Sequence, residues 1–431
     1  MFCAALLLSA FAYGVAVGRF EIFPYAALRE AVSFAKAMRS RLTAEKSWLY
    51  IPTTYSRKLP RYLPEAAYPG LNLVTAVAAD DRLAAYIMDM EGKIIHSWEV
   101  DWFKIWPDAR HLPDKALPKE RPGTHIHGAV VLDDGDIVYN YEHLGLVRLD
   151  LCGDVVWRLP YRTHHSIQKD DEGDLWVSAQ INRVSKDARY SNHKPEFIEP
   201  IILEVSQDGK IKSEISVLEL LRENGLSGLL YMSAKHNRDT SVSGDTLHLN
   251  DVEPFPSSMQ PGLFSPGDLL ISLRNIHTVL VFTAATGRIK HVWAGPFVRQ
   301  HDPDFLDGNT ISVFDNNNIA TRESGQQSQI LLLSAASNER TVYYDGDEKT
   351  PFYTDILGKH QWLPNGNLLI SESVRGRAFE IDPDGRVVWE YINLVEDGYA
   401  ALMEEVQRLP DRMNNVYSEA NVSAKCSKAQ N

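Results

Sequence analysis

Five of the fourteen histidines stand at one recurring position of the sequence, and imidazoles grouped in this way can do acid, base or nucleophilic chemistry. Each of the five precedes a turn glycine: His127, His165, His248, His301 and His360. A single histidine before a turn is more often a capping or packing residue. A buried set makes every member harder to protonate, an arrangement that is costly and rarely kept for packing alone. The recurrence therefore predicts a ring of interacting imidazoles.

The histidines begin copies of a repeat in which a glycine turn, an apolar strand, a D-x-x-G turn and another strand follow. After His165, for example, the copy contains DEGDLWVSA and LEVSQDGKIKSEI, and residues 71–98 fit the same template without a leading histidine. Repeats of roughly 40 residues with four strands each are typical of β-propellers. We therefore expect residues 71–394 to form an all-β, six-bladed β-propeller whose first strands line a central channel and bring the histidines to one mouth.

Arg274 lies in the otherwise apolar stretch LLISLRNIHTVLVF, which we expect to be a strand. A guanidinium there must be paired or must face a ligand. Its planar fork suits a tetrahedral oxyanion such as sulfate or phosphate, and the alternative is a salt bridge to an aspartate of a neighbouring blade. His164 is adjacent to His165, and only one of the two can point into the channel. The spacing favours His165, with His164 as the alternate.

His125 and His127 form an H-x-H pair that can present two metal ligands on one strand face. No nearby carboxylate or cysteine in the sequence completes a ligand set, so we expect no metal site. His96 and His291 precede Trp98 and Trp293 in outer-strand positions, and we expect them to be structural.

Composition excludes several classes of function. The formal net charge is −13 and the isoelectric point is near 5.6, which argues against a protein that neutralises nucleic-acid phosphates. The three cysteines, Cys3, Cys152 and Cys426, form no C-x-x-C pair, so neither a disulfide framework nor a thiolate zinc site is expected. Cys152 is expected to be a small apolar residue at a strand turn. A small molecule is the better candidate for a partner.

The two ends of the chain differ from the propeller. Residues 1–24 begin with an uncharged apolar run that predicts a signal peptide or signal-anchor, and hence a periplasmic or otherwise exported protein that this segment can attach to a membrane. Lys36, Arg39 and Arg41 favour the opposite orientation, so the topology stays open. Within residues 25–70 we expect a helix over 25–46 and a linker. Within 395–431 we expect a helix over 395–410 and a disordered tail after Tyr417.

Two insertions interrupt the predicted blades. Residues 101–124 are rich in proline, and the segment VLELLRENGLSGLL has the spacing of an amphipathic helix. We interpret both as loops inserted between or within blades.

At the histidine positions the chain resembles the arylsulfotransferase family, six-bladed propeller enzymes that move a sulfuryl group between phenols without a nucleotide sulfate donor. The matching segments are THH (163–165), LHLNDVEPF (247–255), LLISLRN (269–275), GRIKHVWAG (287–295), QHDPDFLDGNTISVFDN (300–316) and KHQWLPNGNLLISES (359–373). The resemblance covers roughly residues 71–392. The chain departs from the best-known bacterial members in being shorter, in lacking a clear N-terminal β domain and in showing no cysteine pair.

The resemblance implies that His301 is a covalent nucleophile, with His248, Arg274 and His165 or His164 as its catalytic partners. From their places in the repeat and the motifs we also expect His164, His127, His360 and Asn250 to bind substrate. Trp362 offers a stacking wall for an aromatic substrate. A sulfuryl group would pass from an aryl sulfate donor to His301 and then to a phenolic acceptor, which predicts ping-pong kinetics. No phosphate-binding G-x-x-x-x-G-K-[ST] loop occurs, and no cofactor is expected.

Two other classes of function compete with this interpretation. A metal-dependent propeller hydrolase of the lactonase type needs Asp, Glu and Asn at the channel-lining positions, where this sequence shows histidines. A non-catalytic binding platform would not need an imidazole-rich channel. The sequence leaves the identity of donor and acceptor and the oligomeric state open.

Overall fold

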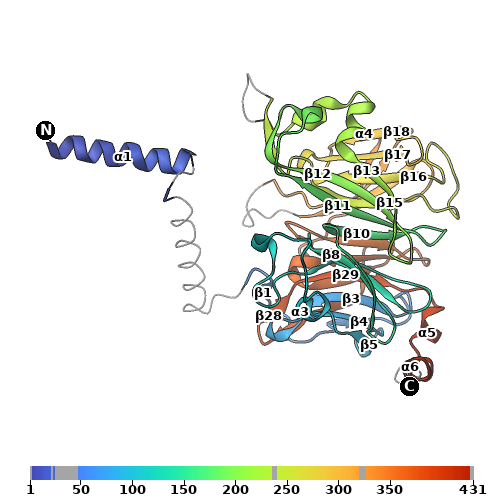
Figure 1. Ribbon diagram of the computed structural model, residues 1–431. Helices are drawn as coiled ribbons and strands as arrows, with labels where there is room; N and C mark the ends of the chain where they lie inside the picture. The colour runs from blue at the N-terminus through green and yellow to red at the C-terminus, as the bar shows by residue number, and fades with distance from the viewer. Residues whose placement is uncertain (1, 21–22, 25–46, 235–239, 320–326, 428–431) are drawn as a thin grey trace. The chain divides into compact units, whose positions relative to one another are not determined.

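Six antiparallel sheets of four principal strands account for most of the chain between residues 72 and 408 (Figure 1). The computed structural model describes residues 2–20, 23–24, 47–234, 240–319 and 327–427. The innermost strand of each sheet contacts the innermost strands of the two neighbouring sheets, so that these strands form a closed ring. The predicted six-bladed β-propeller is therefore confirmed.

Each blade is a meander of neighbouring strands. The innermost strands, in order around the ring, are β29 (Met403–Arg408), β6 (Ile126–Val131), β10 (Thr163–Lys169), β15 (Leu249–Pro254), β19 (His301–Phe305) and β23 (Lys359–Trp362). The second strands are β3 (Asn72–Val77), β7 (Ile137–Tyr141), β11 (Leu175–Arg183), β16 (Asp268–Leu273), β20 (Thr310–Asp315) and β24 (Leu368–Glu372). The third strands are β4 (Leu83–Met88), β8 (Gly145–Leu149), β12 (His193–Val205), β17 (Thr278–Thr283), β21 (Gln329–Ser334) and β25 (Arg377–Ile381). The outermost strands are β5 (Ile94–Trp98), β9 (Val155–Leu159), β13 (Ile211–Ser216), β18 (Arg288–Ala294), β22 (Arg340–Tyr344) and β26 (Val387–Ile392).

The hydrophobic core lies between the blades. The described residues form six apolar clusters, and each cluster joins one pair of neighbouring blades. Val130, Val177 and Ile201, for example, pack between the second and third blades. Because both faces of the middle strands are covered, these strands read as continuous apolar runs such as DLLISL in β16. His96 and His291 pack on Trp98 and Trp293 in outer strands, as expected.

The last strand of the chain completes the first blade. Residues 395–410 were expected to form a helix, and this prediction is wrong: they contain the strands β27 (Leu394–Glu396), β28 (Tyr399–Ala401) and β29. β29 pairs antiparallel with β3, more than three hundred residues earlier in the chain. The propeller therefore extends past residue 394, and the template copy at 71–98 lacks a leading histidine because its innermost strand comes from the other end of the chain.

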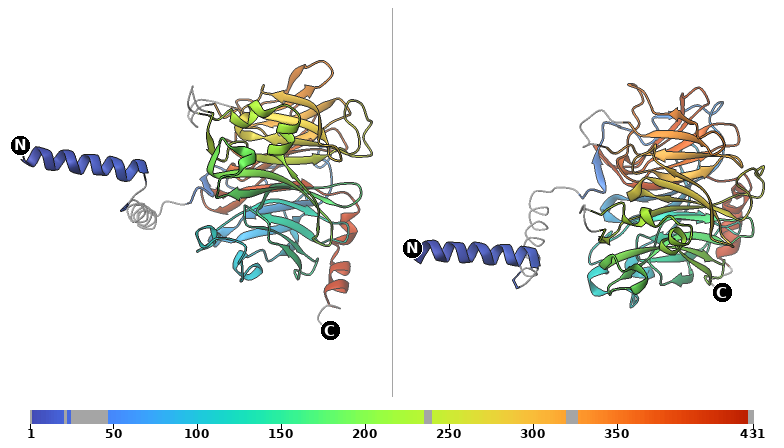
Figure 2. Two further views of the ribbon diagram at one scale, coloured as in Figure 1. Left: turned by 45° about the horizontal axis from the view of Figure 1, so that its top comes forward. Right: turned by 90° about the horizontal axis from the view of Figure 1, so that it is seen from above.

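A disulfide fastens the C-terminal segment to the second blade. Cys152, in the turn between β8 and β9, is bonded to Cys426 at the end of α6 (Glu419–Cys426). The expectation that the cysteines do not pair, and that Cys152 is a small apolar residue, is therefore wrong, as is that of disorder after Tyr417 through residue 427. α5 (Met413–Val416) and α6 lie on the outside of the propeller (Figure 2), where the Tyr417 hydroxyl donates to the Gly135 carbonyl at 3.0 Å.

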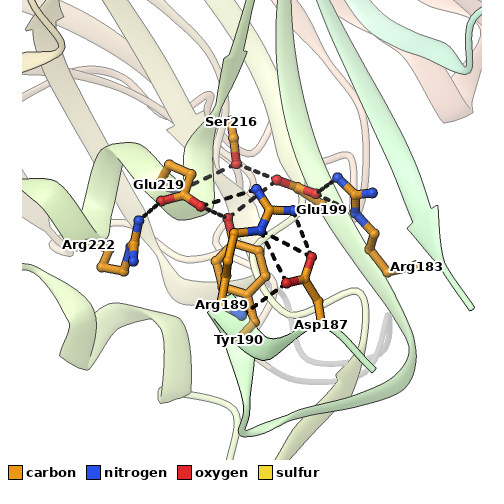
Figure 3. Close-up of polar contacts among 8 residues, drawn as sticks. All are labelled: Arg183, Asp187, Arg189, Tyr190, Glu199, Ser216, Glu219 and Arg222. Atoms are coloured by element: carbon orange, nitrogen blue, oxygen red, sulfur yellow. Dashed lines mark hydrogen bonds and ion pairs between the residues drawn. The ribbon is translucent and has the colours of Figure 1, made fainter. Parts of the chain in front are cut away.

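Insertions extend two of the blades. Residues 101–124 connect β5 to β6 and contain α3 (Trp102–Ile105), and the predicted amphipathic helix is α4 (Val217–Glu223), which buries its leucines against the third blade. Near α4 lies an arginine–glutamate cluster (Figure 3), made of Arg183, Asp187, Arg189, Tyr190, Glu199, Ser216, Glu219 and Arg222. β14 (Val242–Gly244) adds a parallel strand to β12, and β2 (Arg61–Tyr62) pairs with β26.

The chain divides into two units, residues 1–50 and 51–431. The first unit contains the helix α1 (Phe2–Phe20) within the apolar segment, and the strand β1 (Tyr50–Pro52) begins at its end. Across the part of the chain that the structure describes, no helix combines the length and apolar character needed to cross a membrane. The helix expected over 25–46 lies outside the described residues.

Candidate functional site

Four of the five recurrent histidines meet at one mouth of the central channel. The ring centroid of His165 lies 3.7 Å from that of His127, 5.0 Å from that of His248 and 6.1 Å from that of His301. His164 also belongs to the group, because its Nδ1 lies 2.8 Å from Nδ1 of His165. We call His127, His164, His165, His248 and His301 the imidazole cluster. His165 lines the central cavity with His127, Asn250 and His301, as its position in the repeat predicts.

β-bulges aim these side chains into the channel. The pairing register shifts on five of the six innermost strands, and the shift falls at His127 in β6, within 164–166 in β10, at Asn250 in β15 and at Glu404 in β29. The fifth shift falls just after His301 in β19. A bulge adds one residue to a strand and redirects its side chain, which is why bulges recur beside active sites. The site is therefore built by an irregularity that the propeller repeats.

The backbone is strained where the rings are closest. His165 and His248 have φ values of +55° and +56°, a left-handed conformation that non-glycine residues adopt at a cost. Gly128 permits the close approach of β6 to β10, since a Cβ at this position would lie 1.9 Å from the His165 carbonyl oxygen. Contact between the His127 and His165 rings thus depends on Gly128, which follows His127, and on the left-handed conformation of His165 itself.

Asn316 fixes the tautomer of His301. The Asn316 Nδ2 group donates to the carbonyl oxygens of Thr354 and Leu357 at 3.0 and 2.7 Å, so its Oδ1 faces His301 and can only accept. His301 Nδ1 lies 2.6 Å from that oxygen and therefore carries the proton. His301 Nε2 is buried and has no hydrogen-bond partner among the described residues. The nitrogen with the lone pair is the one left available.

Two effects keep His301 neutral. Burial and the nearby Arg274 guanidinium hold the pKa of His301 well below its usual range, and the hydrogen bond to Asn316 opposes them only in part. An imidazole attacks through its neutral form. His301 is therefore neutral at neutral pH, and its Nε2 keeps a lone pair.

The other imidazoles form a hydrogen-bonded chain. Asp245 accepts from Nδ1 of His248, whose Nε2 lies 3.4 Å from Nε2 of His165, and His165 Nδ1 lies next to His164 Nδ1. Because Asp245 only accepts, one consistent set of neutral tautomers has His164 donating to His165 and His165 donating to His248. Burial lowers the pKa of all three imidazoles, and the Asp245 carboxylate opposes this for His248. Such a chain can pass a proton along its length.

Two guanidinium groups share one amide oxygen beside the cluster. Asn275 Oδ1 accepts from Arg299 Nη1 at 2.6 Å and from Arg274 Nε at 3.4 Å. Arg274 lies in the turn after β16 rather than within the strand, and it makes no ion pair with a described residue, so the described residues do not support the salt-bridge alternative. Burial and Arg299 lower the pKa of Arg274 to about 10. Two neighbouring cations without a carboxylate partner form a site suited to an anion.

Asn250 faces the same cavity. Its Nδ2 group donates to the Gln300 carbonyl at 2.8 Å, which joins β15 to the residue before His301. Its Oδ1 is buried and has no hydrogen-bond partner among the described residues, so it can accept a hydrogen bond from a bound hydroxyl group.

His360 and Trp362 do not join the imidazole cluster. His360 Nε2 lies 2.7 Å from the Ser312 hydroxyl and its Nδ1 3.1 Å from Asp302 Oδ2, while Trp362 Nε1 donates to Ser312 at 3.0 Å and its ring packs on Tyr343. β23 has no register shift, so its histidine is not redirected. Neither residue lines the cavity of His301. Their expected roles in substrate binding are therefore not supported by the geometry.

His360 belongs instead to a second polar layer of the channel. That layer contains Asp251, Glu253, Asp302, Asp304, Lys359, His360 and Glu405. Burial and neighbouring carboxylates raise the pKa of Asp251, Glu253 and Asp304 well above their usual range, and Lys359 pairs with Glu405 at 2.7 Å. The channel thus carries carboxylates as well as imidazoles, contrary to the composition expected from the repeat positions.

Four residues of the site were not recognised in the sequence. Asn316 ends the motif F-D-N, Arg299 immediately precedes Gln300-His301, and Asp245 precedes His248 by one helical-turn spacing, so a local signal existed for each. Glu404 had none, because its segment was expected to be helical. It completes a group with Glu142 around His125 and His127, which corrects the expectation that no carboxylate lies near the H-x-H pair.

The comparison with protein families points to one family. The sequence model of the family described as arylsulfotransferase (ASST) matches residues 128–394. No curated protein matches the chain. A Bacteroides caccae protein of unknown function has a similar solved structure, with 12% identity, 79% of this chain and 100% of that chain covered and a TM-score of 0.46. A streptogramin B lyase (13%, 85% and 100%, TM-score 0.42) and the WD40 β-propeller domain of Doa1 (9%, 82% and 98%, TM-score 0.42) are also similar.

Proposed function

The chain belongs to the arylsulfotransferase family, and on that basis we propose that it transfers a sulfuryl group from an aryl sulfate ester to a phenolic acceptor through a covalent intermediate on His301. Family membership supports sulfotransferase activity in general and small-molecule donors and acceptors. The route through His301 is supported by one observation above the others. The buried Nε2 of His301 has a lone pair, set by Asn316, and no partner among the described residues.

The sulfuryl group would be bound by the two guanidinium groups. Transfer through a loose transition state spreads negative charge over the three non-bridging oxygens, by analogy with phosphoryl transfer. Arg274 and Arg299 are held together by Asn275 and lack carboxylate partners among the described residues, so their charge is available to these oxygens. Because the groups are positioned before substrate arrives, they need not reorganise in the transition state.

In the first half-reaction His301 Nε2 attacks the sulfur atom. The nitrogen–sulfur bond forms while the bond between sulfur and the aryl oxygen breaks, and the aryl oxygen leaves with the electron pair. For this step the chain carries one added proton as an imidazolium on His248 beside the Asp245 carboxylate; this proton passes to the leaving phenolate oxygen and leaves the chain neutral. General acid catalysis of this kind contributes about 10²- to 10⁴-fold.

In the second half-reaction a phenol enters in place of the first one. Its hydroxyl proton passes to the same imidazole chain, its oxygen attacks sulfur, and the nitrogen–sulfur bond breaks to restore neutral His301. His127 and Asn250 lie at the cavity wall, where the Asn250 Oδ1 can orient the acceptor hydroxyl. One site used in turn by donor and acceptor gives ping-pong kinetics.

The test uses 4-nitrophenyl sulfate as donor and phenol as acceptor. We expect nitrophenol release by the wild-type protein, none above background by His301→Ala, and wild-type rates for His291→Ala, an outer-strand histidine that packs on Trp293. With donor alone, mass spectrometry of the His301 peptide should show a gain of about 80 Da, the mass of one sulfuryl group on a covalent intermediate.

Two results would contradict the proposal. Equal nitrophenol release by wild type and His301→Ala removes the nucleophile from this position. No release by the wild type from any aryl sulfate favours the non-catalytic platform, and release that depends on water alone favours a hydrolase.

We also propose that the protein works in an oxidising compartment, as expected for an exported protein. The disulfide between Cys152 and Cys426 supports this location, since such bonds persist in the periplasm and outside cells and are rare in the cytosol. Alkylation of free thiols before unfolding, followed by mass spectrometry, should leave both cysteines of the natively produced protein unmodified. Two alkylated cysteines would contradict the location.

A further inference from the structure

Two histidines and two glutamates contact one another in the wall between the first and second blades. His125 contacts Glu142 through Nε2 at 2.5 Å and Glu404 through Nδ1. His127 contacts the same two carboxylates, with its Nδ1 3.4 Å from Glu142 Oε1 and its Nε2 3.5 Å from Glu404 Oε2. Each imidazole therefore faces Glu142 through one ring nitrogen and Glu404 through the other, and ligand atoms of His125, His127 and Glu142 all lie within 4.8 Å of one another.

Most of these contacts are not hydrogen bonds. Both carboxylate oxygens of Glu404 and Nδ1 of His127 are buried and have no hydrogen-bond partner among the described residues. Each nevertheless lies close to a nitrogen or oxygen atom of another of these four side chains. Glu404 and His127 are each only 4% exposed. Buried polar atoms in native proteins are almost always satisfied, so this group lacks something that would satisfy it.

We propose that His125, His127 and Glu142 bind a divalent transition-metal ion of the Zn²⁺ type, with Glu404 accepting hydrogen bonds from the ring nitrogens that do not bind the ion. Imidazole nitrogen and carboxylate oxygen are ordinary zinc ligands. A ligating histidine commonly donates its other ring N–H to a carboxylate, which fixes the tautomer and the orientation of the ring. Glu404 lies at this second nitrogen of both histidines, so it is a positioning residue of the site.

The position of the site gives the ion a structural role. His125 and His127 flank the start of β6, and Glu142 follows β7, so all three belong to the second blade. Glu404 comes from β29, the last strand of the chain, which completes the first blade. The ion together with Glu404 would thus hold the closing strand against its neighbour, and metal binding would add to the stability of the closed ring.

The ion would also touch the imidazole cluster. His127 is both a proposed ligand and the ring nearest to His165. A bound ion would fix the orientation of the His127 ring and keep it deprotonated, because a ligating imidazole must give up the proton on the bound nitrogen. The proposed metal site is therefore separate from His301 but is connected to it through the contacts of His127 with His165 and of His165 with His301.

The experiment measures metal content and stability of the full chain, without reference to activity. Protein purified without chelator is analysed by inductively coupled plasma mass spectrometry, and Tm is recorded with EDTA and after addition of Zn²⁺. We expect about one first-row metal ion per chain, a lower Tm in EDTA and recovery with Zn²⁺. Glu142→Gln, in a partly exposed turn, removes a ligand and should weaken Zn²⁺ binding by about 100-fold, whereas Glu404→Gln should weaken it by about 10- to 100-fold.

Glu199→Gln is the matched control. It removes an equally buried carboxylate from the arginine–glutamate cluster (Figure 3), so it should lower Tm while keeping the metal and the response to Zn²⁺. The proposal is overturned when wild-type protein holds no metal and Zn²⁺ leaves its Tm unchanged, or when Glu142→Gln binds Zn²⁺ as tightly as the wild type. The four residues would then be an imidazolium held between two carboxylates.

Discussion

The imidazole cluster and the arginine–glutamate cluster both include residues of the third blade, but their polar groups differ in how far they are paired. In the arginine–glutamate cluster (Figure 3), the buried Glu199 accepts from Arg183 at 2.6 Å and from the Ser216 hydroxyl at 2.6 Å. Beside the imidazole cluster lies Arg274 without an ion pair among the described residues, and within the cluster His301 has an unpartnered Nε2. Paired groups hold the blade extension together, whereas the unpaired groups are available to a ligand.

The difference follows from which side chains the strands bring next to each other. β12 is unusually long and places Glu199 beside Arg183 of the neighbouring strand β11, so a cation and an anion form a pair. In the channel the innermost strands converge on one axis and bring like residues to like positions. Convergence of a repeat therefore concentrates one chemical type, and that is how a site with perturbed pKa values arises without a special loop.

The largest effect is expected from Arg274→Ala. Loss of one preorganised charge at the sulfuryl oxygens should lower kcat by about 10²- to 10³-fold, whereas stability should stay constant or rise because repulsion with Arg299 is relieved. Arg189→Ala is the control, with an unchanged rate. Steady-state kinetics and urea unfolding measure both quantities. Equal loss of stability in the two variants would mean that Arg274 is a structural residue like those of the other cluster.

Glu199→Gln should produce the largest change in stability within the arginine–glutamate cluster. Removing one member of a buried ion pair leaves its partner charged, and the partly exposed Arg183 reduces the cost to about 2–3 kcal/mol, below the range for fully buried pairs. Urea unfolding gives the free energy. The rate of sulfuryl transfer should remain within about twofold, since the two clusters do different work.

His143, beside the imidazole cluster, should make the free energy of unfolding depend on pH, whereas the arginine–glutamate cluster contains no histidine that could do so. Burial lowers the pKa of His143 from 6.5 to about 4, and the charged groups around it are Glu142, His127, His248 and Arg162. Between these pH values the unfolded chain binds a proton that the folded protein does not, so this group makes stability fall as the pH falls. His143→Asn should remove up to about 1.4 kcal/mol per pH unit from the slope between pH 4 and 6.5.

Asparagine is the suitable replacement because His143 has a φ of +58°, a conformation that asparagine accepts. Free energies of unfolding at several pH values give the slope. An identical slope in wild type and variant would show that His143 is protonated in the folded protein.

The smallest effect is expected from Arg222→Ala. Its ion pair with Glu219 is three residues away on α4, and the arginine side chain is 45% exposed. Exposed pairs of this kind contribute less than about 0.5 kcal/mol. A loss above about 1 kcal/mol in the free energy of unfolding by urea would show that the outer charges of the arginine–glutamate cluster stabilise the protein as much as the buried Glu199 does.

Much of the fold could be predicted because each blade of the propeller corresponds to one copy of a sequence repeat. Turn glycines and apolar strands recur at a period that only this architecture explains, and the repeat register identified His127, His165, His248 and His301 as neighbours. Their convergence needed no information about side-chain contacts, since equivalent positions of a closed repeat are neighbours by symmetry.

The failures have a common physical origin in pairings between distant parts of the chain. MEEVQR has helical composition, but as β29 it gains a partner strand in β3, and tertiary pairing outweighs a weak local preference. The bond between Cys152 and Cys426 spans 274 residues. His360 occupies the predicted repeat position, but β23 lacks the bulge of the other innermost strands. No local pattern reports any of these three facts.

The exchange of one strand between the two ends of the chain imposes an order on synthesis. The second, third and fourth strands of the first blade leave the ribosome before any other blade, yet its innermost strand, β29, is among the last segments to be made. Glu404, in β29, and Cys426, after it, are likewise synthesised after all the other blades. The mouth lined by the imidazole cluster therefore cannot be assembled on a nascent chain, and a message cut short before codon 403 encodes a ring that stays open beside His127.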